Sequence, residues 1–176
     1  MFRERNLEFE TLALPLLEPL YNFAYWLAQN RDEAQDLVQE TFAKALRGFD
    51  GFRRGTNFKA WMFRILRNTF LTSRTGLRAA PTLDIDDPAV EPAIAGTDDP
   101  ERHLLRVLDR EAIERAMEAL PVGYREVVLL CDVEEMKYQE IADLLQVPIG
   151  TVMSRLARGR RQLRALLQQN ELSRKK

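Results

Sequence analysis

Residues 148–161 read PIGTVMSRLARGRR, and this stretch decides the fold of the C-terminal half of the chain. A helical period of about 100° per residue places its polar side chains on one side and its apolar side chains on the other. The polar side holds Thr151, Ser154, Arg155, Arg158, Arg161 and Gln162. The apolar side holds Val152, Leu156, Leu163 and Leu167. The pattern predicts a helix with one buried face and one face suited to phosphates and base edges.

A shorter amphipathic helix is predicted just before it, at residues 138–145. Pro148 marks the start of the longer helix, because proline is tolerated only in the first helical turn. Two helices joined by a turn of three or four residues match the helix-turn-helix. Lys137 stands where this shorter helix begins and cannot accept a capping hydrogen bond, so its first turn is expected to fray.

The second helix of a helix-turn-helix lies in the major groove with its N-terminal residues on base edges. We therefore expect Thr151 and Arg155 to read bases. Ser154, Arg158 and Arg161 are expected to lie nearer the phosphates. The alternative is a solvated basic helix on an ordinary helical protein, which the preceding helix and turn disfavour.

The charge is segregated along the chain, although its formal net value is only -1. Residues 47–78 contain eight basic side chains and one acidic, and residues 151–176 contain the same numbers. Residues 79–100 contain six acidic side chains and no basic one. Two basic patches with an acidic connector between them favour a nucleic-acid partner.

The connector also carries prolines at positions 81, 88, 92 and 100 and has almost no apolar periodicity, which is typical of a flexible linker. Its neighbours show helical patterns, without alternating strands or internal repeats. We therefore expect an all-α protein with a helical domain at residues 1–75, a linker at 76–100 and a helix-turn-helix domain at 101–170.

The composition excludes several classes of protein. With 45% hydrophobic and 30% charged residues, the 176-residue chain is typical of a soluble protein. Without an apolar run of roughly 20 residues or a signal peptide, it is expected to be cytoplasmic and not inserted in a membrane. His103 and Cys131 are the only residues of their types, so we expect no zinc site. Because no nucleophile with a base and no carboxylate cluster is present, we expect neither catalysis nor a cofactor.

Three helices are predicted in the first domain. The first covers residues 7–29, and Pro15 and Pro19 are expected to break or bend its early part. The second begins with Asn30 as N-cap and Glu33 three residues later, as in a capping box. Its outer side carries Asp36, Gln39 and Glu40. Because two carboxylates four residues apart repel slightly, this face favours a basic partner, with a merely solvated face as the alternative.

The third helix is predicted at residues 57–73, where one stripe combines amides, an indole and a guanidinium. The stripe consists of Asn57, Trp61, Arg64 and Asn68. Such a surface suits unpaired bases, which stack on aromatic rings at about 1–3 kcal/mol each. A glycine-punctuated loop with Arg53 and Arg54 precedes the helix and suits an extruded base. The alternative is that Trp61 is a core residue.

Five motifs together resemble one family. They are RDEAQDLVQETFAKAL, NFKAWMFRILRNTF, LPVGYREVVLL, YQEIADLL and PIGTVMSRLARGRRQL. In this order and spacing they resemble the extracytoplasmic function (ECF) subgroup of the sigma-70 family of bacterial RNA polymerase initiation factors. The resemblance covers about residues 20–75 and 105–165.

The resemblance implies roles for particular residues. Asp36, Gln39 and Glu40 correspond to the surface that binds the coiled coil of the polymerase β′ subunit. Thr151, Ser154, Arg155, Arg158 and Arg161 correspond to the readers of the minus-thirty-five element as duplex, in a domain that meets the β flap. The set assigned to melting and holding the minus-ten element as single strand is Arg53, Arg54, Asn57, Lys59, Trp61, Arg64, Arg67 and Asn68.

The resemblance further implies an alternative sigma factor for stress or envelope responses, controlled by an anti-sigma factor and not an obligate homo-oligomer. Two other readings stay open at this point. A repressor or activator would use the C-terminal helices alone, and would need a stable dimer and a palindromic operator. A small nuclease would need a metal-binding carboxylate cluster, which the sequence lacks.

Overall fold

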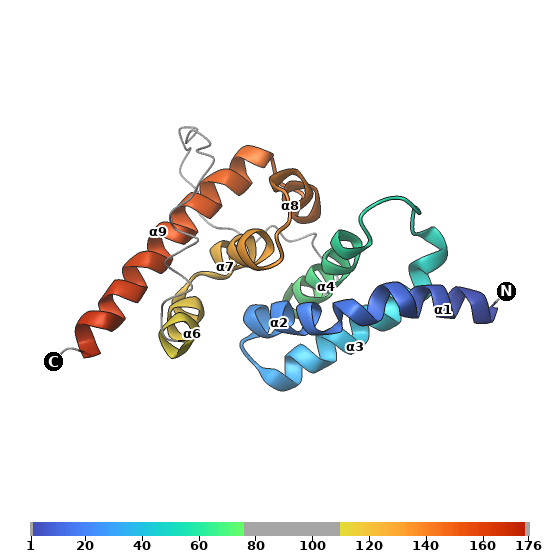
Figure 1. The fold of residues 1–176 in the computed structure, drawn as a ribbon, viewed down its shortest axis with the longest axis horizontal. Coiled ribbons are helices and arrows are strands. Elements are labelled where there is room, and N and C mark those ends of the chain that lie inside the picture. Colours follow the sequence, from blue (N-terminus) through green and yellow to red (C-terminus); the bar gives the residue numbers. More distant parts are fainter. Residues whose placement is uncertain (1, 76–109, 175–176) are drawn as a thin grey trace. The chain divides into compact units, whose positions relative to one another are not determined.

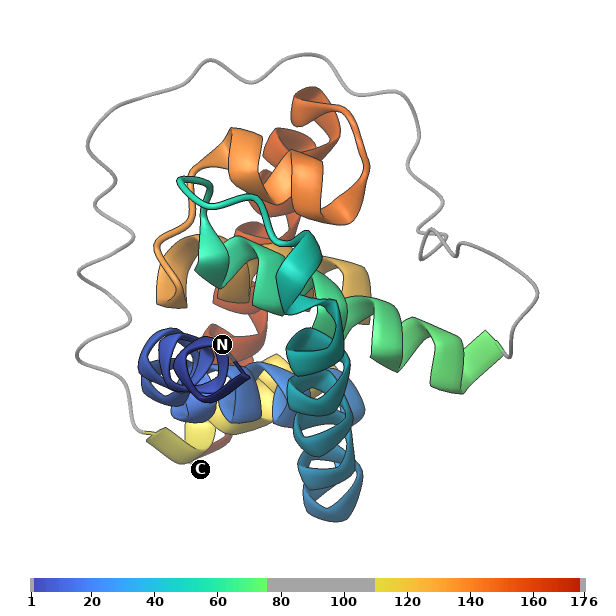
Figure 2. The same ribbon diagram turned by 90° about the vertical axis from the view of Figure 1, so that its right-hand side faces the viewer.

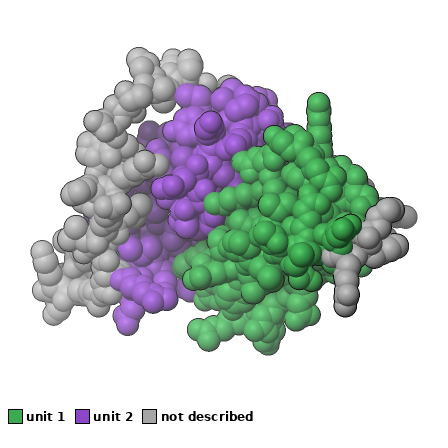
Figure 3. All heavy atoms as spheres, turned by 45° about the vertical axis from the view of Figure 1, so that its right-hand side comes forward, with its two compact units in different colours: residues 1–82 green, residues 83–176 purple. Residues whose placement is uncertain are grey.

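The computed structural model describes residues 2–75 and 110–174 (Figure 1). The chain divides into two compact units, residues 1–82 and 83–176 (Figure 3). Every regular element within these described ranges is helical, which confirms the all-α, two-domain fold class. The expected linker at 76–100 lies outside the described residues, as do residues 101–109 with His103.

Unit 1 consists of four α-helices and two 3₁₀ turns among the described residues. In chain order they are α1 (Phe2–Ala13), η1 (Leu14–Leu16), α2 (Leu17–Ala28), α3 (Arg31–Gly48), η2 (Phe49–Gly51) and α4 (Phe58–Thr75). The helix predicted at 7–29 is interrupted at η1, which contains Pro15, as expected. Pro19 falls in the first turn of α2, where its missing N–H costs no helical hydrogen bond.

The start of α3 is fixed by its cap. The Asn30 side chain accepts a hydrogen bond from the Glu33 backbone N–H at 3.0 Å, as the sequence predicts. Helices α2, α3 and α4 pack on one another (Figure 2). Their core includes the fully buried Leu20, Phe23 and Phe63, with the two phenyl rings 5.2 Å apart. The connection from α3 to α4 lies at the surface of unit 1, where residues 53–57 are exposed.

Unit 2 is built around its long last helix. The described elements are α6 (Arg110–Ala119), α7 (Val122–Val128), the π-helical turn η4 (Leu129–Val133), α8 (Tyr138–Leu145) and α9 (Ile149–Arg174). Helix α9 contacts α6, α7 and α8 along its length (Figure 1). At Gly159 helix α9 lies close against α7, because a Cβ there would be 3.2 Å from Cβ of Tyr124 and from Cγ2 of Val128.

Helices α8 and α9 form the predicted helix-turn-helix. Gln146 ends α8 in the left-handed conformation, with φ at 56°. The Pro148 carbonyl accepts from the Thr151 N–H at 2.9 Å, which starts α9 one residue later than Pro148. At the start of α8 the Glu140 carboxylate accepts from the Lys137 N–H at 2.9 Å. The expectation of a frayed first turn is therefore wrong, because the capping bond is supplied by the helix itself.

Two arginines join the other elements of unit 2. Arg125 donates to the Met117, Glu118 and Leu120 carbonyls at 2.6–2.9 Å, and so satisfies the C-terminal end of α6. Arg160 of α9 donates to both carboxylate oxygens of Asp132, at 3.1 and 2.5 Å. The Asp132 hydrogen bond raises the pKa of Arg160. The Arg160 guanidinium therefore stays charged at every physiological pH.

Candidate nucleic-acid interface

The connection from α3 to α4 is a short loop with a fixed turn. The Thr56 N–H and hydroxyl both donate to the Arg53 carbonyl, at 3.2 and 2.6 Å. Gly55 occupies the third position of this turn with φ at +88°, a conformation that favours glycine. The four-residue turn 53–56 therefore presents both arginine side chains from a defined backbone.

An aromatic cluster lies beneath this turn. Phe49 and Phe52 stack with centroids 6.2 Å apart, and Phe52 and Phe58 meet edge to face at 5.2 Å. Trp61 is half-buried, with its ring 5.1 Å from Phe52 and 5.5 Å from Phe58. The indole is thus neither a fully buried core residue nor free of the core. One part of it packs on the cluster, and the rest is accessible for stacking.

Arg53 and Arg54 differ in their surroundings. The Arg54 guanidinium donates to both Glu8 carboxylate oxygens, at 2.9 and 2.7 Å. That hydrogen bond, opposed by slight desolvation, lowers the pKa of Glu8 below its ordinary 4.5. The ion pair therefore contributes its full stabilisation above the ordinary pKa of Glu8. This stabilisation is lost as the pH falls through the lowered pKa. The Arg53 side chain is exposed and has no ion pair within the described parts of the chain.

Only part of the stripe predicted on α4 is exposed to solvent. Asn57 caps the helix, because its Oδ1 accepts from the Ala60 N–H at 3.0 Å. Arg64 is half-buried and Asn68 is exposed. Lys59 is half-buried, with its ammonium 5.8 Å from the Phe63 ring centroid. The stripe thus offers Trp61, Arg64 and Asn68, next to the turn.

Arg67 departs from the prediction, because it is only 4% exposed. It follows the buried Phe63 by four residues and precedes the buried Phe70 by three, so it lies on the packed side of α4. An arginine in that position does not reach DNA in this conformation. The helical spacing of the two phenylalanines was the signal that could have identified it.

The acidic face of α3 is exposed at all three predicted positions, Asp36, Gln39 and Glu40. Glu40 also forms an ion pair with Lys44 at 2.7 Å, one turn further along the helix. This ion pair partly offsets the repulsion expected between Asp36 and Glu40. It was not among the predictions made from the sequence. An i,i+4 pairing of Glu40 with Lys44 was visible in the sequence.

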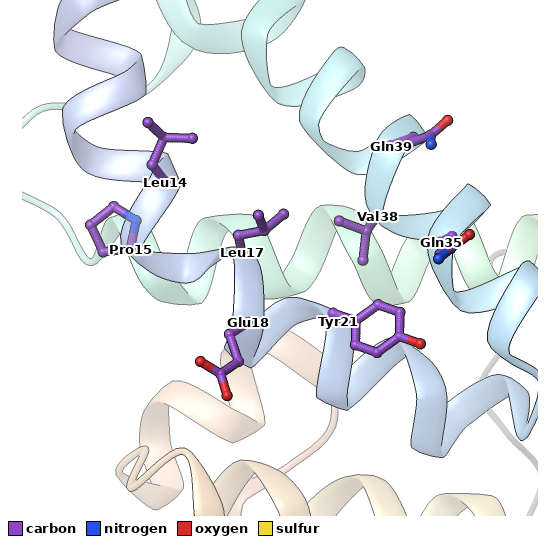
Figure 4. Close-up of a pocket in the computed structure, with 8 residues that line it drawn as sticks. All are labelled: Leu14, Pro15, Leu17, Glu18, Tyr21, Gln35, Val38 and Gln39. Atoms are coloured by element: carbon purple, nitrogen blue, oxygen red, sulfur yellow. The ribbon is translucent and has the colours of Figure 1, made fainter.

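A groove of about 720 Å³ borders this acidic face. Its lining residues are Leu14, Pro15, Leu17, Glu18, Tyr21, Gln35, Val38 and Gln39 (Figure 4). Leu17, Tyr21 and Val38 face one another across it. Leu14 and Leu17 are 60% and 48% exposed, which is high for large apolar side chains. The groove is therefore an apolar depression beside an acidic helix face.

The polar face of α9 is also less open than the sequence predicts. Thr151 and Arg158 are half-buried and Arg161 is exposed, but Ser154 and Arg155 are only 8% and 6% exposed. The Ser154 hydroxyl donates to the Thr151 carbonyl at 3.0 Å. Arg155 lies one helical turn from the buried Val152, at the edge of the packed stripe. The prediction that Ser154 and Arg155 lie on an exposed face is therefore wrong, because both side chains are buried.

The described residues contain no group of three or more side chains able to hold a metal ion. Within the same residues, no helix is both long enough and apolar enough to span a bilayer.

Two family models match the chain, one in each unit. Residues 12–79 match the model described as "Sigma-70 region 2", and residues 110–163 match "Sigma-70, region 4". The matches leave nearly all of α1 outside the family models. They include the turn, α4 and the helix-turn-helix.

Curated relatives and a solved structure agree with these matches. The ECF RNA polymerase sigma factor SigE of Mycolicibacterium smegmatis is 38% identical over 154 residues, covering 84% of this chain and 57% of that protein. The chain thus spans little more than half the length of that relative. The ECF RNA polymerase sigma factor EcfG of Rhodopseudomonas palustris is 34% identical over 154 residues, covering 88% of this chain and 82% of that protein.

The solved structure is that of the sigma factor RpoE in complex with the anti-sigma factor NepR from Bartonella quintana. It is similar with a TM-score of 0.70 at 32% identity, covering 92% of this chain and 97% of that chain. Both units, the order of the two matched regions and the identity to these relatives lead to one assignment. The chain belongs to the sigma-70 family of RNA polymerase sigma factors, in the ECF group.

Proposed function

We propose that this chain is an alternative sigma factor that binds core RNA polymerase, directs it to specific promoters and helps to open the DNA. The observation that carries the proposal is the combination of two surfaces in one chain. Unit 1 presents a basic turn above an aromatic cluster, and unit 2 presents a helix-turn-helix. The first suits unpaired bases and the second suits intact duplex.

In unit 1, Arg53, Trp61, Arg64 and Asn68 are the residues through which we propose that the minus-ten element is held as single strand. Strand opening costs stacking and pairing energy, which captured bases and phosphate contacts offset. Trp61 supplies a ring for stacking, and Arg53 supplies an exposed cation in the preceding turn. Arg54, Asn57 and Lys59 belong to the same surface, although contacts within unit 1 already engage them.

In unit 2, we propose that Thr151, Arg158 and Arg161 contact the minus-thirty-five element as duplex. Thr151 lies in the first turn of α9, the part of a recognition helix that meets base edges. Arg158 and Arg161 follow at helical spacing and suit the phosphates. Ser154 and Arg155 would join them only after a rearrangement of their side chains.

The polymerase-binding surface is proposed at Asp36, Gln39 and Glu40 of α3. A basic helical partner such as the β′ coiled coil matches these acidic side chains, and the adjoining groove receives its apolar residues. The β flap is the proposed partner of unit 2. With the polymerase as partner, the site of action is the cytoplasm, and the chain functions as one copy per polymerase.

Regulation by an anti-sigma factor is part of the proposal. Its support is the similarity to RpoE, which was solved in complex with the anti-sigma factor NepR. A response to stress or to envelope damage, released when the anti-sigma factor is removed, fits this mode of control.

Run-off transcription with core RNA polymerase on a randomised promoter library tests the proposed function. We expect the chain to confer transcription from a distinct set of promoters, and core enzyme alone to give none. Asp36→Lys with Glu40→Lys is expected to abolish co-purification with core polymerase, whereas Glu10→Lys on α1 leaves it intact. Absence of promoter-specific transcripts, or unchanged co-purification of the reversed variant, would contradict the proposal.

A further inference from the structure

Helix α1 holds the turn of unit 1 through two ion pairs. Arg5 donates to the Asp50 carboxylate at 2.7 Å and to the Leu46 carbonyl at 3.2 Å, just before the loop. Glu8, one helical turn further along α1, receives two hydrogen bonds from Arg54 inside the turn. The two anchors thus fix the loop at its start and at its tip. We refer to these two ion pairs as the α1 brace.

An apolar contact supports the brace. Phe9 of α1 is 4% exposed, with its ring 5.3 Å from Phe49 and 6.2 Å from Phe58, both edge to face. These two rings belong to the aromatic cluster on which Trp61 rests. A buried aromatic contact therefore holds helix α1 against the loop. The two ion pairs of the brace then fix the position of the loop.

The bidentate geometry gives Arg54 a different task from Arg53. Two parallel N–H to oxygen bonds fix the orientation of a guanidinium as well as its distance. Arg54 follows Arg53 directly in the turn, so holding the Arg54 side chain holds the stretch of backbone from which Arg53 projects. The Arg53 side chain is left exposed. The brace therefore holds the turn that carries this exposed cation, without contacting DNA itself.

We propose that the α1 brace positions the minus-ten loop, with Arg54 acting as a positioning residue and Arg53 as the loop's contact to unpaired DNA. This inference rests on the proposed function of unit 1. It concerns Arg5 and Glu8, which lie outside the matched family region that begins at residue 12. A misplaced contact group weakens a complex even when the group itself is present, so loosening the brace reduces selectivity.

The test uses the full chain with core RNA polymerase and compares Glu8→Gln, Arg54→Gln, their combination, and the exchange Glu8→Arg with Arg54→Glu. We expect each single variant to lower open-complex formation about threefold, as for a partner in a well-oriented surface ion pair. Discrimination among promoters with single changes in the minus-ten element should fall with it. The combined variant should be no worse than either single variant, and the exchange should recover most of the loss. Glu10→Gln, exposed on the same helix, is the matched control.

The opposite pattern would overturn the inference. If Arg54 contacts DNA directly, Glu8 competes with the phosphates, so Glu8→Gln would increase open-complex formation while Arg54→Gln decreases it. The exchange would then fail to restore activity. Unchanged selectivity in all variants would equally contradict a positioning role.

A measurement without polymerase separates this inference from the proposed function. Hydrogen exchange of residues 48–57 in the free chain should quicken in Glu8→Gln and Arg54→Gln, and stay unchanged in Glu10→Gln. Faster exchange in a chain that gives no promoter-specific transcription would disprove the proposed function and leave the brace as a property of the fold. Unchanged exchange would disprove the brace whatever the transcription result.

Discussion

Trp61 combines a packed edge with an accessible remainder, which gives a prediction at the scale of one residue. Trp61→Ala removes the stacking surface, and stacking of one base contributes about 1–3 kcal/mol. We expect open complexes to fall by about tenfold, since about 1.4 kcal/mol corresponds to that factor. Permanganate footprinting of unpaired thymines measures the opening.

The control for this prediction is Trp61→Phe, which keeps a ring on Phe52 and Phe58. It should retain most of the opening. Co-purification with core polymerase should be normal in both variants, because the acidic face of α3 is untouched. Normal footprints in Trp61→Ala would rule out the stacking role.

Arg125 gives a second prediction at this scale, on stability. It is 5% exposed and donates to three carbonyls at the end of α6. Burial lowers the pKa of Arg125, but these carbonyls compensate for the lost water. Arg125→Met removes these three hydrogen bonds from the buried end of α6, and we expect a loss of about 3 kcal/mol in the free energy of unfolding of unit 2.

Urea denaturation followed by circular dichroism measures this loss. Arg110→Met is the control, because Arg110 is exposed and has an ion pair with Glu114 one turn away. It should change the free energy by less than about 0.5 kcal/mol. Equal effects of the two substitutions would show that Arg125 does not cap α6.

At the scale of elements, the crossing of α7 and α9 depends on a missing side chain. Gly159→Ala should gain about 1 kcal/mol of helix propensity. Its Cβ would however meet Tyr124 Cβ and Val128 Cγ2 at 3.2 Å and the Tyr124 carbonyl oxygen at 3.4 Å. Because these atoms belong to the backbone of α7 or lie within two bonds of it, α7 must move. We expect a net loss of about 1–2 kcal/mol in the free energy of unfolding.

Gly150 provides the matched comparison in the same helix. A Cβ there meets nothing within 4 Å, so Gly150→Ala should be neutral or slightly stabilising. Thermal unfolding by circular dichroism distinguishes the two substitutions. A higher midpoint for Gly159→Ala would mean that the two helices can separate without cost.

The helices themselves were predictable because their signals are local. The shorter helix of the helix-turn-helix was expected at 138–145 and is found at Tyr138–Leu145. The helix expected at 57–73 is found at Phe58–Thr75. Caps, proline positions and apolar spacing all act within one or two helical turns, so these signals can be identified from the sequence alone.

The exposure of single side chains was less predictable. Arg64 and Arg67 both follow an apolar residue of α4, and only the spacing of Phe63 and Phe70 indicates that Arg67 is the buried one. The brace left no local signal, since Glu8 and Arg54 lie 46 residues apart. Contacts of this kind depend on how α1 lies against the loop, and periodicity contains no information about that packing.

At the scale of the whole molecule, the proposal assigns different promoter elements to the two units. Thr151→Ala should weaken binding to a complete promoter by about tenfold at most, the effect of one lost base contact. It should have no further effect on a promoter whose minus-thirty-five element has been replaced. Arg53→Ala should weaken both promoters alike.

Filter binding of the holoenzyme to the two promoters, with each variant, completes this cycle. Replacing the minus-ten element instead should exchange the behaviour of the two variants. Additive losses in every combination would show that the units do not read separate elements. Because Arg158 is proposed to meet phosphates, Arg158→Ala should instead weaken binding to both promoters alike and reduce its salt dependence by about one charge.

Both tryptophans of the chain, Trp26 and Trp61, lie in unit 1. Ultraviolet excitation of the indoles therefore reports on this unit alone, and unit 2 contributes only tyrosine emission. Trp26→Phe would leave Trp61 as a single built-in fluorophore at the edge of the aromatic cluster. Its quenching by a stacked base would follow promoter melting in real time, without an attached dye.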